Sequence, residues 1–269
     1  MGIVLGNIIA IYRRELQSYF VSPLAYAIAG IFWFIAGLFI VMILLGPNGI
    51  FAAAATIDFQ AQQGQPIPTI DFAYEFVRAF LDSMGGLLLF ILPILSMGLY
   101  AEERKRGTLE LLATSPITNW AVAVGKFLGV LTFFITMVLP VVMLEAIAIG
   151  GASPPITPSV PLVGHFGLIL LAGAILSLGM FISSLTESTI LSAVLTFAVI
   201  LLLLFIDTIA RNIPGFIGEA LGYLSFLKHY NTLIQGIFDT SALILFASYI
   251  FLGIFLTAQS IDALRFGRQ

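Results

Sequence analysis

The feature that most restricts the fold is a series of long apolar stretches, since each is close to the length that crosses a lipid bilayer. Crossing about 30 Å of hydrocarbon takes roughly 20 helical residues. The chain has 269 residues, of which 60% are hydrophobic and only 9% are charged, whereas soluble domains carry about 25% charged residues. We therefore expect an all-α polytopic membrane protein with six transmembrane helices, at residues 24–45, 85–100, 120–149, 162–184, 189–206 and 242–260.

The segments between the apolar stretches differ in character. Residues 1–20 have apolar residues at helical spacing and a basic end, which is typical of an amphipathic helix lying in the membrane interface. Residues 46–83 are more polar, and the Gln- and Pro-rich part at 60–68 predicts a loop, after which helical spacing returns. Residues 207–241 are interrupted by Pro and Gly, so we expect two short surface or re-entrant helices there rather than a span.

The distribution of Lys and Arg predicts the orientation in the membrane. Six spans place both termini on one side, and cytoplasmic flanks carry the excess of basic residues. One side would hold eight basic residues and the other three: Arg13, Arg14, Arg104, Lys105, Arg106, Lys126, Arg265 and Arg268 against Arg78, Arg211 and Lys228. We therefore predict that both termini are cytoplasmic, and that segments 46–83, 150–161 and 207–241 lie outside. A five-span interpretation would move the C-terminal arginines outside and break this agreement.

A dense charged stretch lies between the second and third predicted spans, at residues 101–126. Its charged start cannot remain in lipid, so the stretch must protrude from the membrane. Glu102 and Arg106 are spaced i,i+4 and Glu103 and Arg106 are spaced i,i+3, so local ion pairs are available. The residues alone leave two interpretations: a solvated anchor that fixes topology, or a short coupling helix presented to a cytoplasmic partner.

Three segments resemble one known family. Residues 101–117, AEERKRGTLELLATSPI, are similar to the signature after the second span in membrane subunits of type-2 ATP-binding-cassette (ABC) exporters. Residues 13–23, RRELQSYFVSP, resemble the N-terminal elbow helix of that family. Residues 228–239 resemble the segment before the last span in the subgroup that includes gliding-motility and copper-reductase-maturation permeases. The matches occur in order along most of the chain.

The resemblance implies partners and roles for these segments. The chain would be a permease that dimerises with a second permease, identical or related, and pairs with two ATP-binding subunits. Residues 102–114 would be the coupling helix, residues 207–241 the extracellular helix pair, and Arg13, Arg14 and Glu15 part of the interfacial elbow. The coupling residues would be Glu102, Glu103, Arg104, Lys105, Arg106, Gly107, Thr108, Leu109 and Leu112.

Several polar residues lie within or beside the predicted spans. Glu145 is in the outer third of the third helix, where a carboxylate is costly, so it is a candidate for the translocation path; the alternative is a snorkelled or hydrogen-bonded helix-end residue. Asp207, at the outer end of the fifth span, is a second candidate, with a boundary residue as the alternative. Lys126, about one turn into the third helix, can snorkel inward. His165 and His229 are far apart and no third ligand is evident, so we predict no metal site.

The chain lacks the motifs of an enzyme. It has no G-x-x-x-x-G-K-[ST] phosphate-binding loop, so we expect no cofactor on this chain, with ATP and Mg²⁺ held by a partner ATPase. It has no cysteine, which excludes disulfides and thiolate catalysis. Membrane lipids are expected partners, and nucleic acid is not.

Two functional hypotheses from different classes follow. The first is the permease subunit of an ABC exporter in a bacterial plasma (inner) membrane, which moves a substrate at the expense of ATP hydrolysed by its partner. The alternative is a force-transmitting anchor of a gliding or envelope complex that moves no cargo and binds a periplasmic subunit at residues 207–241. An intramembrane enzyme would need a Ser/His pair, paired Asp residues or a metal-ligand helix at matching depth, and none is evident.

Overall fold

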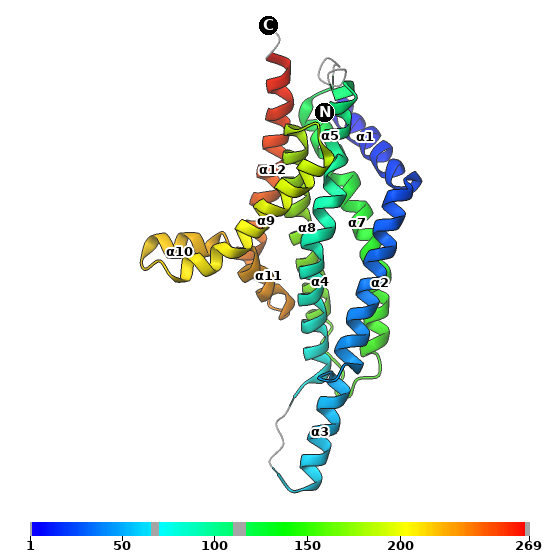
Figure 1. Cartoon of the computed structure of the whole chain (residues 1–269), viewed down its shortest axis with the longest axis vertical. Coiled ribbons are helices and arrows are strands. Elements are labelled where there is room, and N and C mark those ends of the chain that lie inside the picture. Colours follow the sequence, from blue (N-terminus) through cyan, green and yellow to red (C-terminus); the bar gives the residue numbers. More distant parts are fainter. Residues whose placement is uncertain (1, 66–69, 110–116, 267–269) are drawn as a thin grey trace.

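The computed structural model describes residues 2–65, 70–109 and 117–266, and within these ranges all regular structure is helical (Figure 1). Six helical segments are long and apolar enough to span a membrane: Pro23–Gln62, Phe72–Lys105, Asn119–Ile149, Ser159–Leu185, Thr189–Arg211 and Thr240–Ala263. The prediction of an all-α chain with six membrane-length helical segments is confirmed. The helices are α1 (Gly2–Val21), α2 (Pro23–Leu45), α3 (Ile50–Gln62), α4 (Phe72–Ser96), α5 (Gly98–Lys105), α7 (Asn119–Ile149), α8 (Ser159–Leu185), α9 (Thr189–Arg211), α10 (Phe216–Tyr223), α11 (Phe226–Ile234) and α12 (Thr240–Phe266).

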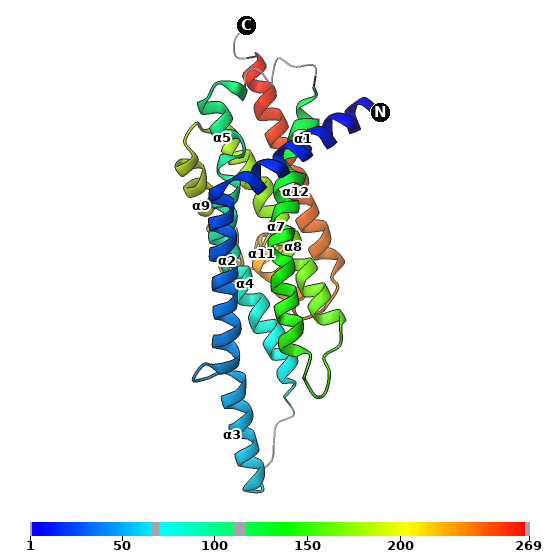
Figure 2. The same ribbon diagram turned by 90° about the vertical axis from the view of Figure 1, so that its right-hand side faces the viewer.

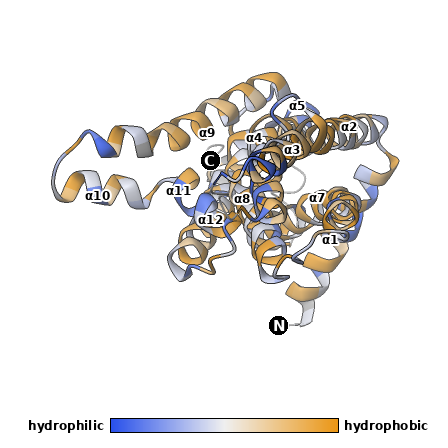
Figure 3. Cartoon of the chain, turned by 90° about the horizontal axis from the view of Figure 1, so that it is seen from below, coloured by the Kyte–Doolittle hydropathy of each residue, from blue (hydrophilic) through white to orange (hydrophobic). Residues whose placement is uncertain are grey.

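Helix α8 forms the centre of the bundle. Its most apolar stretch is 78% buried inside the chain, against 22% for the span that begins with α2 and 17% for α9. It packs against α4, α5, α7, α9, α11 and α12. The two weakly buried helices expose many apolar side chains. Their ribbons are largely in the hydrophobic colour in the view from below (Figure 3). Such surfaces require lipid or another apolar partner, because water would leave them unfavourably exposed.

The second span starts earlier than the sequence suggests. The expected span at residues 85–100 is the later part of a helix that begins at Phe72. Asp71 caps its start by accepting a hydrogen bond from the Tyr74 backbone N–H at 3.0 Å. Phe76 and Phe80, one turn apart, are buried and stacked on each other. The early turns are therefore held by packing, although their outward face carries Arg78 and other polar residues.

The first polar segment also contains a helix that was not expected. We predicted a loop over residues 60–68, but residues 60–62 belong to α3, which projects beyond the end of the bundle (Figure 1). The alanine run at residues 52–55 explains this, because Ala has the highest intrinsic helix propensity. The remainder of that predicted loop lies partly outside the described residues.

The expected coupling helix at residues 102–114 does not run as one helix. Helix α5 ends at Lys105, and Gly107 has a φ of 70°, a left-handed conformation that glycine adopts without strain. Thr108 and Leu109 are helical again, and residues 110–116 lie outside the described ranges. The charged residues up to Lys105 and the helical residues Thr108 and Leu109 therefore belong to two successive segments joined at Gly107.

The two short helices before the last span differ from each other. Helix α10 extends away from the bundle at mid-height, whereas α11 lies against it (Figure 1). Helix α11 buries Phe226, His229, Tyr230, Leu233 and Ile234. It packs against α4, α8, α9 and α12. Two short helices were expected in this segment, and the second of them belongs to the core of the bundle.

Helices α1 and α5 and the end of α12 lie at the same end of the bundle, opposite α3 (Figures 1 and 2). Helix α1 crosses this end at a steep angle to α2 and packs against α7 (Figure 2). The segments that carry most of the basic residues are thus gathered at one end.

Candidate functional site

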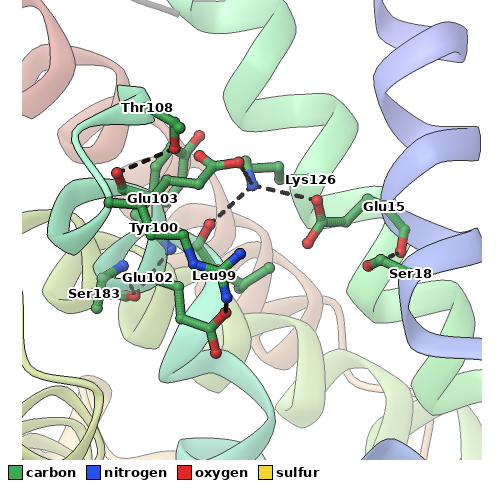
Figure 4. Close-up of polar contacts among 11 residues, drawn as sticks. Glu15, Ser18, Leu99, Tyr100, Glu102, Glu103, Thr108, Lys126 and Ser183 are labelled. Carbon is green, nitrogen blue, oxygen red and sulfur yellow. Dashed lines mark hydrogen bonds and ion pairs between the residues drawn. The ribbon is translucent and has the colours of Figure 1, made fainter. Parts of the chain in front are cut away.

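The charged end of the bundle is organised around Lys126, about two turns into α7. Its Nζ lies 2.9 Å from Glu103 Oε1 of α5 and 3.2 Å from Glu15 Oε2 of α1 (Figure 4). It also donates a hydrogen bond to the Leu99 carbonyl oxygen at 2.9 Å and lies 5.0 Å from the centre of the Tyr100 ring. One ammonium group therefore joins three helices, of which α1 is far from the other two in the sequence.

The burial of this cluster makes its contacts mutually dependent. The Lys126 side chain is 5% exposed, and those of Glu15 and Glu103 are 17% and 21% exposed. The ammonium group of Lys126 extends to the charged end of the bundle, where the two carboxylates hold it. Two carboxylates share one cation here, so loss of the lysine would leave both without a counter-charge in a poorly solvated site.

Close helix packing brings α1 to this cluster. A Cβ atom built on Gly125 would lie 2.8 Å from Ile11 Cβ, and one on Gly129 would lie 2.8 Å from Glu15 Cβ. These two glycines are spaced i,i+4 on either side of Lys126, and such small-residue pairs let helices approach closely in a membrane. The Gly-Lys-x-x-Gly pattern is the sequence signal that would have indicated this contact.

Helix α5 is attached to the centre of the bundle by Ser183 of α8. The Ser183 hydroxyl accepts hydrogen bonds from the backbone N–H groups of Tyr100 and Ala101 at 3.1 and 3.0 Å, and donates one to the Met97 carbonyl at 2.8 Å. These backbone groups are left free by the break between α4 and α5, and they need partners away from water. One hydroxyl thus forms hydrogen bonds with three backbone groups at the break and fixes the position of α5.

Arg104 anchors the same helix to the turn between α8 and α9. Its Nη1 donates to the Ser184 carbonyl at 2.7 Å, and its Nε lies 3.9 Å from the Glu187 carboxylate. Arg104 is one of the predicted coupling residues. Its guanidinium group contacts Ser184 and Glu187 of this chain, and its side chain is 28% exposed.

The other predicted coupling residues are mostly on the surface. Arg106 and Glu102 form an exposed ion pair at 3.5 Å, the i,i+4 pair that the sequence suggests. Lys105 and Thr108 are exposed, and Leu109 is buried. Leu112 lies outside the described residues. On α1, Arg13 and Arg14 are exposed, whereas Glu15 points into the Lys126 cluster.

A polar cavity of about 530 Å³ lies between α1 and α5, beside the cluster. Its lining includes charges of both signs, from Arg14, Glu15, Glu102, Glu103 and Arg106. Nearby, Tyr19 of α1 donates a hydrogen bond to the Leu95 carbonyl at 3.2 Å. Burial, together with the charges of Glu15 and Glu102, raises the pKa of the Tyr19 phenol well above its usual value. Its hydroxyl therefore remains a donor, which holds α1 against α4.

The second buried charge cluster lies near the opposite end of α7. Glu145 Oε2 is 3.1 Å from His165 Nε2 of α8, and the two side chains are 2% and 10% exposed. The two atoms are close enough for an ion pair, although they are not aligned as a hydrogen bond. His165 Nδ1 lies 2.8 Å from the Pro161 carbonyl, so it must carry a hydrogen. The Nε2–carboxylate contact is then attractive only if the pair holds one further proton.

The structure thus gives separate outcomes for the predicted intramembrane residues. Glu145 is buried between α7 and α8 and does not snorkel. Asp207 lies within α9, which continues to Arg211, but its side chain is outside what the structure describes. His229 lies 3.8 Å from the Asp239 carboxylate. The described residues contain no group of three or more His, Cys, Asp or Glu side chains that would hold a metal ion.

The sequence comparison decides the family. A family model for ABC-2 family transporter proteins matches residues 10–269. The chain belongs to the ABC-2 transporter family. It is 26% identical over 178 residues to the "Probable multidrug ABC transporter permease YbhR" of Escherichia coli K12, and equally so to its counterpart in E. coli O157:H7. The matched region is 64% of this chain and 45% of each relative, so the chain spans less than half of their length.

Membership in this family places the helical bundle in a defined context. The chain is a multi-pass membrane protein of the ABC-2 permease type. The resemblance noted in the charged stretch and the elbow therefore belongs to a family relationship that covers nearly the whole chain.

Proposed function

We propose that this chain is the permease subunit of an ABC exporter, and that the Lys126 cluster transmits the motion of a partner ATPase into the bundle. The observation that supports this is the convergence of α1, α5 and α7 on one buried ammonium group. Because α5 carries Glu103, a movement of α5 away from Lys126 breaks an ion pair whose ammonium group also holds Glu15 of α1. The cluster therefore links any displacement of the charged stretch to two other helices.

The proposed docking surface is the exposed part of the same region. Glu102, Lys105, Arg106 and Thr108 present polar groups at the end of the bundle where α1 and α12 also terminate. In this proposal that end is cytoplasmic, in a bacterial inner membrane, because it gathers most of the basic residues. Two ATP-binding subunits would bind there, one for each permease of a dimer. ATP binding would shift the permease between inward- and outward-open states only through contacts that differ between those states.

The family relationship favours transport over the anchor hypothesis. The relatives are described as probable multidrug permeases, which supports an export role for the proposed complex. The subgroup that includes gliding-motility permeases remains our finer proposal, and it rests on residues 228–239. Those residues include Tyr230, which donates a hydrogen bond to the Leu81 carbonyl at 2.5 Å and fixes α11 to α4.

The test is a charge exchange on the proposed docking surface. The tagged chain is purified from its native membrane, its ATPase is identified by mass spectrometry, and the complex is reconstituted in vesicles. We expect Arg106→Glu to reduce the permease-stimulated ATPase rate at least about tenfold, and the exchange Glu102→Arg with Arg106→Glu not to restore it. Glu219→Arg on the distant helix α10 is the matched control and is expected to leave the rate unchanged.

The exchange variant separates the two interpretations of the charged stretch. If the pair only fixes local structure or topology, the exchanged pair re-forms and stimulation returns. Restored stimulation in the exchange variant, or full stimulation in Arg106→Glu, would contradict the docking proposal.

A further inference from the structure

A second cavity lies in the bundle, away from the charged end. It has a volume of about 340 Å³ and is bounded by α4, α8, α9 and α11. Its wall is almost entirely apolar and includes Leu171, Leu204, Phe205 and Phe226. Ligand sites for small molecules have volumes of about 300–1,000 Å³ and are mostly apolar, with a few polar groups that fix orientation.

One carboxylate faces this apolar space. Asp82 of α4 lines the cavity and lies about three turns inside a helix that is part of a membrane-length segment. Within the described ranges Asp82 makes no hydrogen bond or ion pair, not even with Arg78 one turn earlier on the same helix. The Asp82 side chain is exposed, so its charge is accessible to a ligand at the mouth of the apolar cavity.

The neighbouring polar group does not compensate that charge. Tyr230, which also lines the cavity, donates its hydroxyl hydrogen to the Leu81 carbonyl of α4. The aromatic rings of Tyr230 and Phe226 both line the cavity. Aromatic faces attract organic cations, so they add to the preference set by the carboxylate.

We propose that this cavity binds a lipophilic organic cation, with its apolar body among α4, α9 and α11 and its positive charge beside Asp82. Complementarity of charge selects a cation over a neutral or anionic compound of the same shape. The site would give the proposed exporter a substrate class, and that transport role rests on the proposed function. Binding itself requires neither ATP nor a partner ATPase.

Two adjacent glycines provide a sharp way to block the cavity. A Cβ atom on Gly85 would lie 2.4 Å from Tyr230 Cε1, so this position cannot accept a side chain without displacing the Tyr230 ring. A Cβ atom on Gly86, which lines the cavity, would meet nothing within 4 Å. Gly86→Leu should therefore fill the cavity without a clash inside the chain.

The experiment measures equilibrium binding of radiolabelled tetraphenylphosphonium to the full chain in phosphatidylcholine nanodiscs, with empty nanodiscs as background. We expect saturable binding to the unaltered protein. Asp82→Asn should weaken it by about tenfold, since it removes the negative charge that faces the bound cation beside an apolar wall. Asp82→Glu should retain affinity within about threefold. Gly86→Leu should abolish binding, and Gly30→Leu, at an open position on α2, should not.

Tetraphenylborate, which has the same shape and the opposite charge, is expected not to compete. The proposal is overturned if the unaltered protein shows no saturable binding, if Asp82→Asn binds within twofold of it, or if tetraphenylborate competes as well as unlabelled tetraphenylphosphonium. These results do not depend on ATPase stimulation, so failure of the cation site and failure of the export proposal remain distinguishable.

Discussion

Helix α7 carries two buried charged clusters, and they are built differently. Near its start, Lys126 is held by two carboxylates and a carbonyl from α1 and α5. Near its end, Glu145 faces His165 alone, on the next helix of the chain. The first cluster joins three helices through one cation, and its Glu15 lies 111 positions from Lys126. The second joins only two consecutive helices, through a single contact of 3.1 Å. A displacement of one helix therefore affects two others at Lys126, but only one other at Glu145.

The largest expected effect is that of removing the shared cation. Lys126→Met leaves two buried carboxylates without a counter-charge, and breaking a buried pair in this way costs about 3–5 kcal/mol of unfolding free energy. Unfolding in mixed detergent micelles, followed by tryptophan fluorescence, measures the change. Lys105→Met, at an exposed position next to the cluster, is the control. A loss below about 1 kcal/mol, the size expected of a surface pair, would show that the cluster does not hold the three helices together.

The contact between Glu145 and His165 is expected to contribute less to the free energy of unfolding. Glu145→Gln removes the negative charge but keeps the size of the side chain, so the contact with His165 is weakened rather than left with an unpaired charge. We expect the free energy of unfolding to fall by about 1–3 kcal/mol, the range for one impaired buried polar contact. The same unfolding measurement applies, with Gln62→Glu on the projecting helix α3 as the control. If Glu145→Gln proves as destabilising as Lys126→Met, the distinction between the two clusters fails.

The smallest effect on stability is expected at the exposed pair. Glu102→Gln removes an ion pair whose two side chains are 55% and 73% exposed. Surface pairs of this kind contribute about 0–1 kcal/mol. We expect unchanged unfolding but reduced ATPase stimulation in the reconstituted complex. Destabilisation above about 2 kcal/mol would mean that the pair is structural rather than part of a docking surface.

Much of the fold could be predicted from local pattern. The lengths of the apolar stretches give six spans, because a helix must satisfy its own backbone in lipid. Ser22-Pro23 is another local signal, because it marks the start of α2. The Ser22 hydroxyl accepts a hydrogen bond from the Ala25 backbone N–H. The helical spacing of the early turns of α4 was recognised, but not that these turns continue without interruption into the second span. Their polar outer face made the apolar stretch appear to begin only at residue 85.

The candidate site could be predicted only in part. The charged stretch and the elbow were identified by their residues and by family resemblance. The role of Lys126 was not, since Glu15 lies 111 positions away and no spacing rule connects them. The role of Ser183 could not be predicted either, because it depends on contact with the junction between α4 and α5, which is distant in the sequence.

From the residues alone one obtains the membrane class, the number of spans and the position of the charged stretch. These follow from solvation, which acts on each segment separately. The partners of Lys126, the isolation of Asp82 beside an apolar cavity and the attachment of α5 to α8 appear only in the folded bundle. They depend on which helices approach one another, and that is decided by close packing at small residues and by the need to pair every buried polar group.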